Sequence, residues 1–106
     1  MSTPEISVQE LAALKKANAD ILILDVRNAD EYAICNLGGK LIPINDLPSR
    51  THELNPDQQI IVHCHGGGRS RRATELLINQ GFKNVANLRG GITAWAKEID
   101  PSMPTY

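Results

Sequence analysis

Residues 60–70 read Ile-Ile-Val-His-Cys-His-Gly-Gly-Gly-Arg-Ser. The apolar run at 60–62 predicts a buried strand, and the glycines and serine after it predict a tight loop that leads into a helix. Such a loop surrounds a thiol with backbone N–H groups and the positive end of the helix dipole. We therefore expect Cys64 to be a nucleophilic thiolate. The expected substrate-binding loop consists of His65, Gly66, Gly67, Gly68, Arg69 and Ser70, with Ser70 capping the helix.

A simpler interpretation of Cys64 is a packed core residue, because free cysteine is often buried and behaves as a small hydrophobe. The three glycines argue against it, since they cost conformational entropy and are useful mainly where the backbone curls tightly or faces a ligand. Positive charge from Arg69, Arg71 and Arg72 would meet an anionic substrate, although arginines on a helix surface are ordinarily solvated.

Strand and helix patterns alternate along the chain. Short apolar runs predict strands at residues 21–24, 41–44, 60–62 and 85–88. Capping signals and apolar spacing predict helices that begin near residues 8 and 29, and helices over 70–80 and 92–99. This alternation predicts an α/β fold with a mainly parallel sheet and helices on both faces. Cys64 then lies beyond the carboxyl ends of the strands, where such sheets bind ligands.

Composition predicts one domain over residues 1–106, because 106 residues with 42% hydrophobic content can bury a single core. A formal net charge of −1 and four aromatic residues give no case for nucleic acid as a partner. The apolar run at 21–24 is far shorter than a membrane span, and the first residues lack a basic and apolar leader. We therefore expect a cytoplasmic protein with no membrane partner.

Five stretches, in order, resemble the rhodanese family. Residues 64–69 are similar to its active-site loop C-x-x-G-x-R/S/T, and residues 25–32, with Asp25, Arg27 and Glu31, to its D-V-R-x-x-x-E-[FY] element. The other matches are residues 41–43 to N-x-P/I-P, 81–85 to G-[FY]-x-x-V and 88–95 to L-x-G-G-[IM]-x-x-W. Residues 35–39 keep only part of the family's G-H-I-x-G turn. The resemblance thus covers nearly the whole chain.

The resemblance implies the five-stranded rhodanese fold and a sulfurtransferase that carries sulfur as a Cys64 persulfide, with no cofactor. Thiosulfate or a cysteine-desulfurase persulfide would be the donor. Cys35 and the ending at 96–106 look like the C-terminal rhodanese domain of adenylyltransferase/sulfurtransferase enzymes. That branch implies an E1-like adenylating domain and a ubiquitin-like sulfur-carrier protein as partners, with molybdopterin synthesis, thiamine synthesis and tRNA thiolation all open. Few side-chain walls at 65–68 suggest an open mouth that admits a protein tail.

Other polar residues receive two interpretations each. Asp25 and Arg27 form an ion pair or cap that fixes the loop after their strand, or they support the catalytic loop indirectly. Cys35 is a buried small residue, or a resolving thiol if it lies near the reactive one. His65 is expected to line the pocket and His63 to pack. No metal site is expected, because no second Cys/His pair completes a tetrahedral ligand set.

Two rival functions stay open. A cysteine phosphatase of related fold holds phosphate between a cysteine and an arginine by the same backbone and dipole logic, but the loop between Cys64 and Arg69 is one residue shorter than in those enzymes. An inactive rhodanese-like module would only bind partners. Such modules typically lack the reactive cysteine, so the presence of Cys64 argues for activity.

Overall fold

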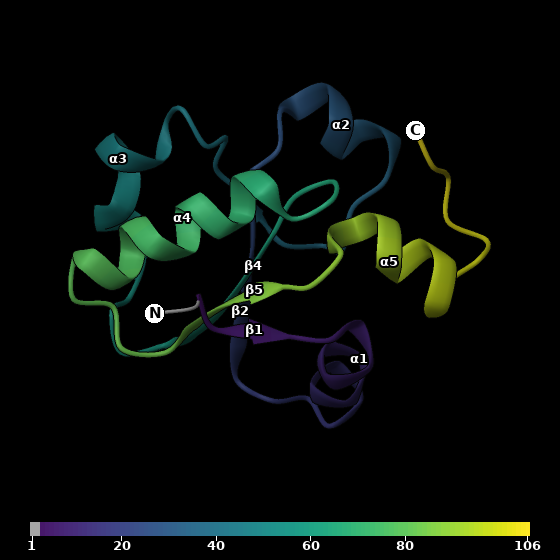
Figure 1. Ribbon diagram of the computed structural model, residues 1–106, viewed down its shortest axis with the longest axis horizontal. Helices are drawn as coiled ribbons and strands as arrows, with labels where there is room; N and C mark the ends of the chain where they lie inside the picture. Colours follow the sequence, from purple (N-terminus) through teal and green to yellow (C-terminus); the bar gives the residue numbers. More distant parts are fainter. Residues whose placement is uncertain (1–2) are drawn as a thin grey trace.

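The computed structural model describes residues 3–106 and contains a five-stranded sheet in the order β1-β5-β4-β2-β3 (Figure 1). Every strand pairing is parallel, which confirms the predicted fold class. The strands are β1 (Glu5–Ile6), β2 (Ile21–Asp25), β3 (Lys40–Leu41), β4 (Gln59–His63) and β5 (Val85–Leu88). The helices are α1 (Val8–Lys16), α2 (Ala29–Ile34), α3 (Leu47–Arg50), α4 (Gly68–Asn79) and α5 (Gly91–Glu98), with a 3₁₀ turn η1 (Thr51–Glu53) after α3.

Two apolar cores lie on opposite faces of the sheet. Ile60 and Val62 of β4 pack in the core that includes α3 and α4, whereas Ile61 packs in the core that includes α1 and α5. Successive residues of a strand point to opposite faces, so a continuous apolar run is what a strand covered on both sides requires. β4 is the central strand, and Cys64 directly follows its carboxyl end, in the loop that leads into α4 (Figure 1).

Helix α4, which was predicted over residues 70–80, begins two residues earlier than expected. Gly67 is its N-cap, with a φ of +123° that disfavours other residues, and α4 starts at Gly68. Ser70 is therefore not the helix cap, and the prediction of a capping role was wrong. Because the glycine loop turns so sharply, Ser70 falls in the first helical turn, where its backbone N–H is free to face the loop.

The capping box predicted at the start of α1 is confirmed. The backbone N–H of Glu10 donates to Ser7 Oγ at 3.0 Å, and that of Ser7 donates to Glu10 Oε1 at 3.2 Å. Strand β1 was not predicted, because two residues show no periodicity; its pairing with β5 brings Glu5 opposite Asn87. Within residues 3–106 no helix is long and apolar enough to cross a membrane.

Candidate active site

The sulfur of Cys64 accepts hydrogen bonds from backbone N–H groups of the loop that follows it. The backbone N–H groups of Gly67 and Ser70 donate to Sγ at 3.2 and 3.4 Å, and the Ser70 hydroxyl lies 3.3 Å from it. The loop folds this way because the positive φ of Gly67 reverses the chain and turns the following amides back toward the strand end. The arrangement stabilises negative charge on the sulfur, by hydrogen bonds and by the start of α4.

The Cys64 residue is only 1% exposed, whereas other residues of its loop are exposed to solvent. Gly66 and Gly68 are exposed, so the surface above the sulfur consists largely of backbone. A reagent must therefore approach through the glycine loop. This geometry differs from the expected open mouth, because the sulfur lies beneath the loop rather than at its surface.

Ser70 links the sulfur to β5. Its hydroxyl donates to Oδ1 of Asn87 at 2.5 Å, a side chain that is almost fully buried, and the main-chain oxygen of Gly67 lies 3.1 Å from the same hydroxyl oxygen. Asn87 was not singled out from the sequence. Its only signal was a polar residue inside the apolar run at 85–88.

The start of α5 fixes the backbone of the catalytic loop. The N–H of Ile92 donates to the Cys64 carbonyl at 3.0 Å, and the N–H and hydroxyl of Thr93 donate to the His65 carbonyl at 3.1 and 2.9 Å. Gly91 has a φ of +61°, and a Cβ placed on it would overlap both carbonyl groups. Only glycine lets α5 approach this closely.

Arg69 pairs with an acidic side chain of the protein itself. Its guanidinium forms a two-pronged ion pair with Glu31 of α2, at 2.7 and 2.9 Å. This pairing holds the pKa of the Glu31 carboxyl at about 2, because the bond from Arg69 favours the charged form. Arg71 lies on the exposed helix face near Glu75, at 3.5 Å, and Arg72 is exposed. Of the positive charge expected at the loop, that of Arg69 is neutralised by Glu31.

Asp25 and Arg27 form a fully buried ion pair, with the guanidinium 2.6 Å from the carboxylate. Arg27 also donates to the main-chain oxygen of Cys35 at 2.8 Å, so the pair ties the end of β2 to the end of α2. His63 lies alongside, its Nε2 3.6 Å from Asp25 Oδ2, and burial lowers its pKa to about 4. Neutral His63 is fully buried and packs beside the ion pair.

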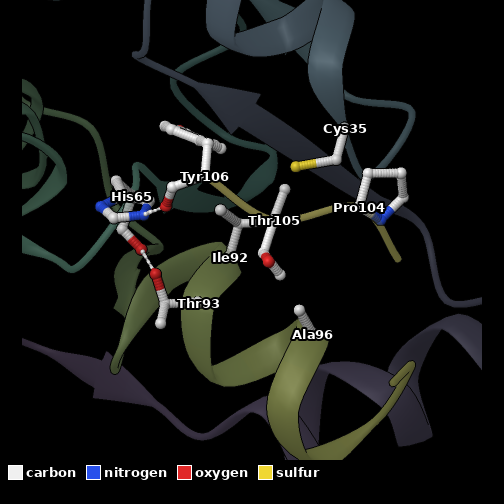
Figure 2. A pocket seen from close by; sticks show the side chains of 8 residues that line it. All are labelled: Cys35, His65, Ile92, Thr93, Ala96, Pro104, Thr105 and Tyr106. Carbon is white, nitrogen blue, oxygen red and sulfur yellow. Dashed lines mark hydrogen bonds between the residues drawn. The ribbon is translucent and has the colours of Figure 1, made fainter. Parts of the chain in front are cut away.

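A cavity of about 100 Å³ lies beside the catalytic loop (Figure 2). Its lining residues are Cys35, His65, Ile92, Thr93, Ala96, Pro104, Thr105 and Tyr106. His65 therefore lines a pocket as predicted, whereas Cys64 does not. The free thiol of Cys35, 8% exposed, faces this cavity and lies 4.0 Å from the Arg27 guanidinium. Within residues 3–106, no three His, Cys, Asp or Glu side chains cluster as metal ligands.

The segment after α5 reaches the same loop. The Tyr106 ring lies 4.5 Å from the His65 ring, and its hydroxyl bonds to Arg27 and Glu31. Sequence reasoning missed this contact, because nothing in an isolated aromatic residue indicates which distant residues it touches. The contact of Glu31 with Arg69 was equally hidden, since Glu31 was interpreted only as a helix-start signal and part of a family motif.

A central parallel strand that delivers a cysteine into an amide-lined glycine loop defines an α/β domain suited to nucleophilic chemistry at sulfur. The match to the Rhodanese-like domain family extends over residues 7–98. The chain belongs to the rhodanese-like domain family.

Curated relatives and solved structures agree with this assignment. The chain is 42% identical over 89 residues to the "Rhodanese-like/PpiC domain-containing protein 12, chloroplastic" of Arabidopsis thaliana, covering 79% of this chain but 30% of that protein. It is 35% identical to a "Sulfurtransferase" of Allochromatium vinosum, covering 88% of each. It is 31% identical to "Adenylyltransferase and sulfurtransferase UBA4" of Meyerozyma guilliermondii, covering 95% of this chain but 26% of that protein. The structure of a thiosulfate sulfurtransferase from Pseudomonas aeruginosa is 38% identical with a TM-score of 0.81, covering 90% of this chain and 19% of that one.

Proposed function

We propose that this protein is a sulfurtransferase that carries sulfane sulfur as a persulfide on Cys64. The observation that carries the proposal is the pair of backbone N–H groups, from Gly67 and Ser70, aimed at Sγ. Such donors favour a negatively charged Sγ, which is the nucleophile of the first step. After transfer Sγ is the inner atom of the persulfide, and the negative charge lies on the transferred outer sulfur beside the same loop. The names of the Allochromatium and Pseudomonas relatives, a sulfurtransferase and a thiosulfate sulfurtransferase, support the same chemistry.

The transfer needs no group beyond the thiol. The Cys64 thiolate attacks the outer sulfur of thiosulfate; a new S–S bond forms at Sγ, the S–S bond of thiosulfate breaks, and sulfite leaves with the electron pair. A desulfurase persulfide reacts in the same way, with its cysteine thiolate as the leaving group. In the second step a thiophilic acceptor, such as cyanide, takes the outer sulfur and releases the Cys64 thiolate. The loop amides stabilise charge in both steps.

For the physiological acceptor we propose the C-terminus of a ubiquitin-like sulfur-carrier protein, activated by an E1-like adenylating domain. The UBA4 relative supports this proposal, because its name joins adenylyltransferase and sulfurtransferase activities in one protein. Both cysteines are free thiols, which suits the reducing cytoplasm that we expect as the compartment.

The phosphatase alternative is less favoured by the geometry. A phosphatase needs its arginine to face the bound phosphate, whereas Arg69 is held by Glu31.

Thiocyanate formation from thiosulfate and cyanide tests the proposal, with Cys35→Ser as the matched control for Cys64→Ser. We expect turnover by the wild type and by Cys35→Ser, and none above background by Cys64→Ser. Hydrolysis of an aryl phosphate without thiocyanate would instead identify a phosphatase. If the folded protein shows neither thiocyanate formation nor phosphate hydrolysis, a module that only binds partners is favoured.

A further inference from the structure

After α5, residues 101–106 turn back along the helix and end beside α2 and the catalytic loop (Figure 1). Pro104, Thr105 and Tyr106 form one wall of the cavity, and residues of α5 form the opposite wall (Figure 2). The segment therefore covers a largely apolar cavity, which without residues 104–106 would be an open groove next to His65.

Tyr106 is attached to the active site at several points. His65 Nε2 donates to the main-chain oxygen of Tyr106 at 3.0 Å, and the two rings lie 4.5 Å apart and tilted by 35°. The Tyr106 hydroxyl accepts from the buried Arg27 guanidinium at 3.0 Å and donates to Glu31 Oε2 at 2.8 Å. A phenol between a cation and a carboxylate makes two charge-assisted bonds, which are stronger than neutral ones. The ring itself is 43% exposed, so these polar contacts, rather than burial, hold it.

Glu31 connects Tyr106 to the catalytic loop by a second route. Its Oε2 accepts from the Tyr106 hydroxyl and also from Arg69, at 2.9 Å. Arg69 belongs to the first turn of α4, directly after the glycines that surround the sulfur. The position of Tyr106 is thus coupled to both ends of the loop, through His65 at its start and Arg69 at its end.

We propose that Tyr106 is a positioning residue that selects by size what reaches Cys64, a role that rests on the proposed sulfur transfer. With the segment in place, approach is confined to the exposed glycines, which a small anion such as thiosulfate can pass. A polypeptide end needs more room, and it gains that room when Tyr106 leaves His65 and Glu31, because the loop between His65 and Arg69 is then free to open over the sulfur. Polypeptide substrates then meet a barrier that small donors do not.

Labelling of Cys64 by N-ethylmaleimide and by a polyethylene-glycol maleimide tests this role, because the two reagents share their chemistry and differ only in bulk. All variants carry Cys35→Ala, so that Cys64 is the only thiol in the chain. Tyr106→Phe keeps the ring and removes the hydroxyl, and Tyr106→Ala removes both. Tyr32→Phe is the matched control, since its hydroxyl bonds only to the Gly39 carbonyl, outside the catalytic loop.

We expect the bulky reagent to react about tenfold faster or more with Tyr106→Phe, because one lost hydrogen bond to a charged group is worth about 1.5 kcal/mol, and faster still with Tyr106→Ala. The rate with N-ethylmaleimide should change less than twofold, and Tyr32→Phe should match the parent with both reagents. Equal acceleration of both reagents would mean general loosening of the loop and would overturn size selection, as would no change with either. Labelling does not involve sulfur transfer, so an inactive protein that still selects by size would count against the proposed function alone.

Discussion

Removal of the Arg27 guanidinium should be among the most destabilising single changes outside the apolar core. The side chain is 0% exposed and makes three short contacts with the Asp25 carboxylate, between 2.6 and 3.1 Å. Arg27→Met preserves much of the volume but leaves a buried carboxylate without its cation. Breaking a buried pair in this way costs about 3–5 kcal/mol. For a domain of this size that loss lowers Tm by about 15–30 °C.

Urea unfolding followed by circular dichroism measures the loss, and the exposed pair of Arg71 and Glu75 supplies the control. Those two side chains lie 3.5 Å apart in solvent, so Arg71→Met should cost less than about 0.5 kcal/mol. The double variant Asp25→Leu/Arg27→Met should recover part of the stability, because no uncompensated charge is left. If Arg27→Met costs no more than Arg71→Met, the buried pair does not hold the ends of β2 and α2 together as argued.

Three further changes have distinct signatures. Because burial lowers the pKa of His63 to about 4 from about 6.5 in the unfolded chain, the free energy of unfolding should fall as pH drops from 6.5 to 4. His63→Leu should flatten this pH dependence of the urea midpoint, and an unchanged slope would contradict the assignment to His63. Glu31 has a pKa of about 2, so its contribution to the free energy of unfolding is present above about pH 4.5 and is lost as pH falls toward 2. Glu31→Gln should reduce the loss of stability in acid, and an identical fall of the urea midpoint with pH would refute the assignment. Gly91→Ala should cost about 2 kcal/mol or more and slow thiocyanate formation, because a Cβ there overlaps the carbonyls of Cys64 and His65 and a φ of +61° is strained for alanine. Wild-type stability and turnover in this variant would show that the close approach of α5 is unimportant.

The sequence was most informative where the physics is local. Apolar runs in β2, β4 and β5 predicted strands within a residue or two, because a strand covered on both faces must be apolar throughout. The capping box of Ser7 and Glu10 likewise fixed the start of α1. Cys64 and its glycines were predicted as a unit, since the thiol, the loop and the helix start are contiguous.

Contacts between distant segments were not predictable from one sequence. Arg69 was assigned to an anion by its place in the loop, yet its partner is Glu31, which lies 38 residues away. Tyr106 lies 75 residues from Glu31 and 79 from Arg27, so no spacing rule connects them. Ser70 was misassigned for a different reason: a helix can begin at a glycine when the loop before it turns sharply, and the favoured cap residue then falls inside the first turn.

Localised mass measurement after incubation with thiosulfate tests the central claim most directly. The protein is desalted, weighed intact and then digested, with free thiols blocked by an alkylating reagent. We expect one additional sulfur atom per chain, on the peptide that carries residue 64, and its loss as thiocyanate when cyanide is added. An unmodified Cys64, or the extra sulfur on Cys35 alone, would contradict the account.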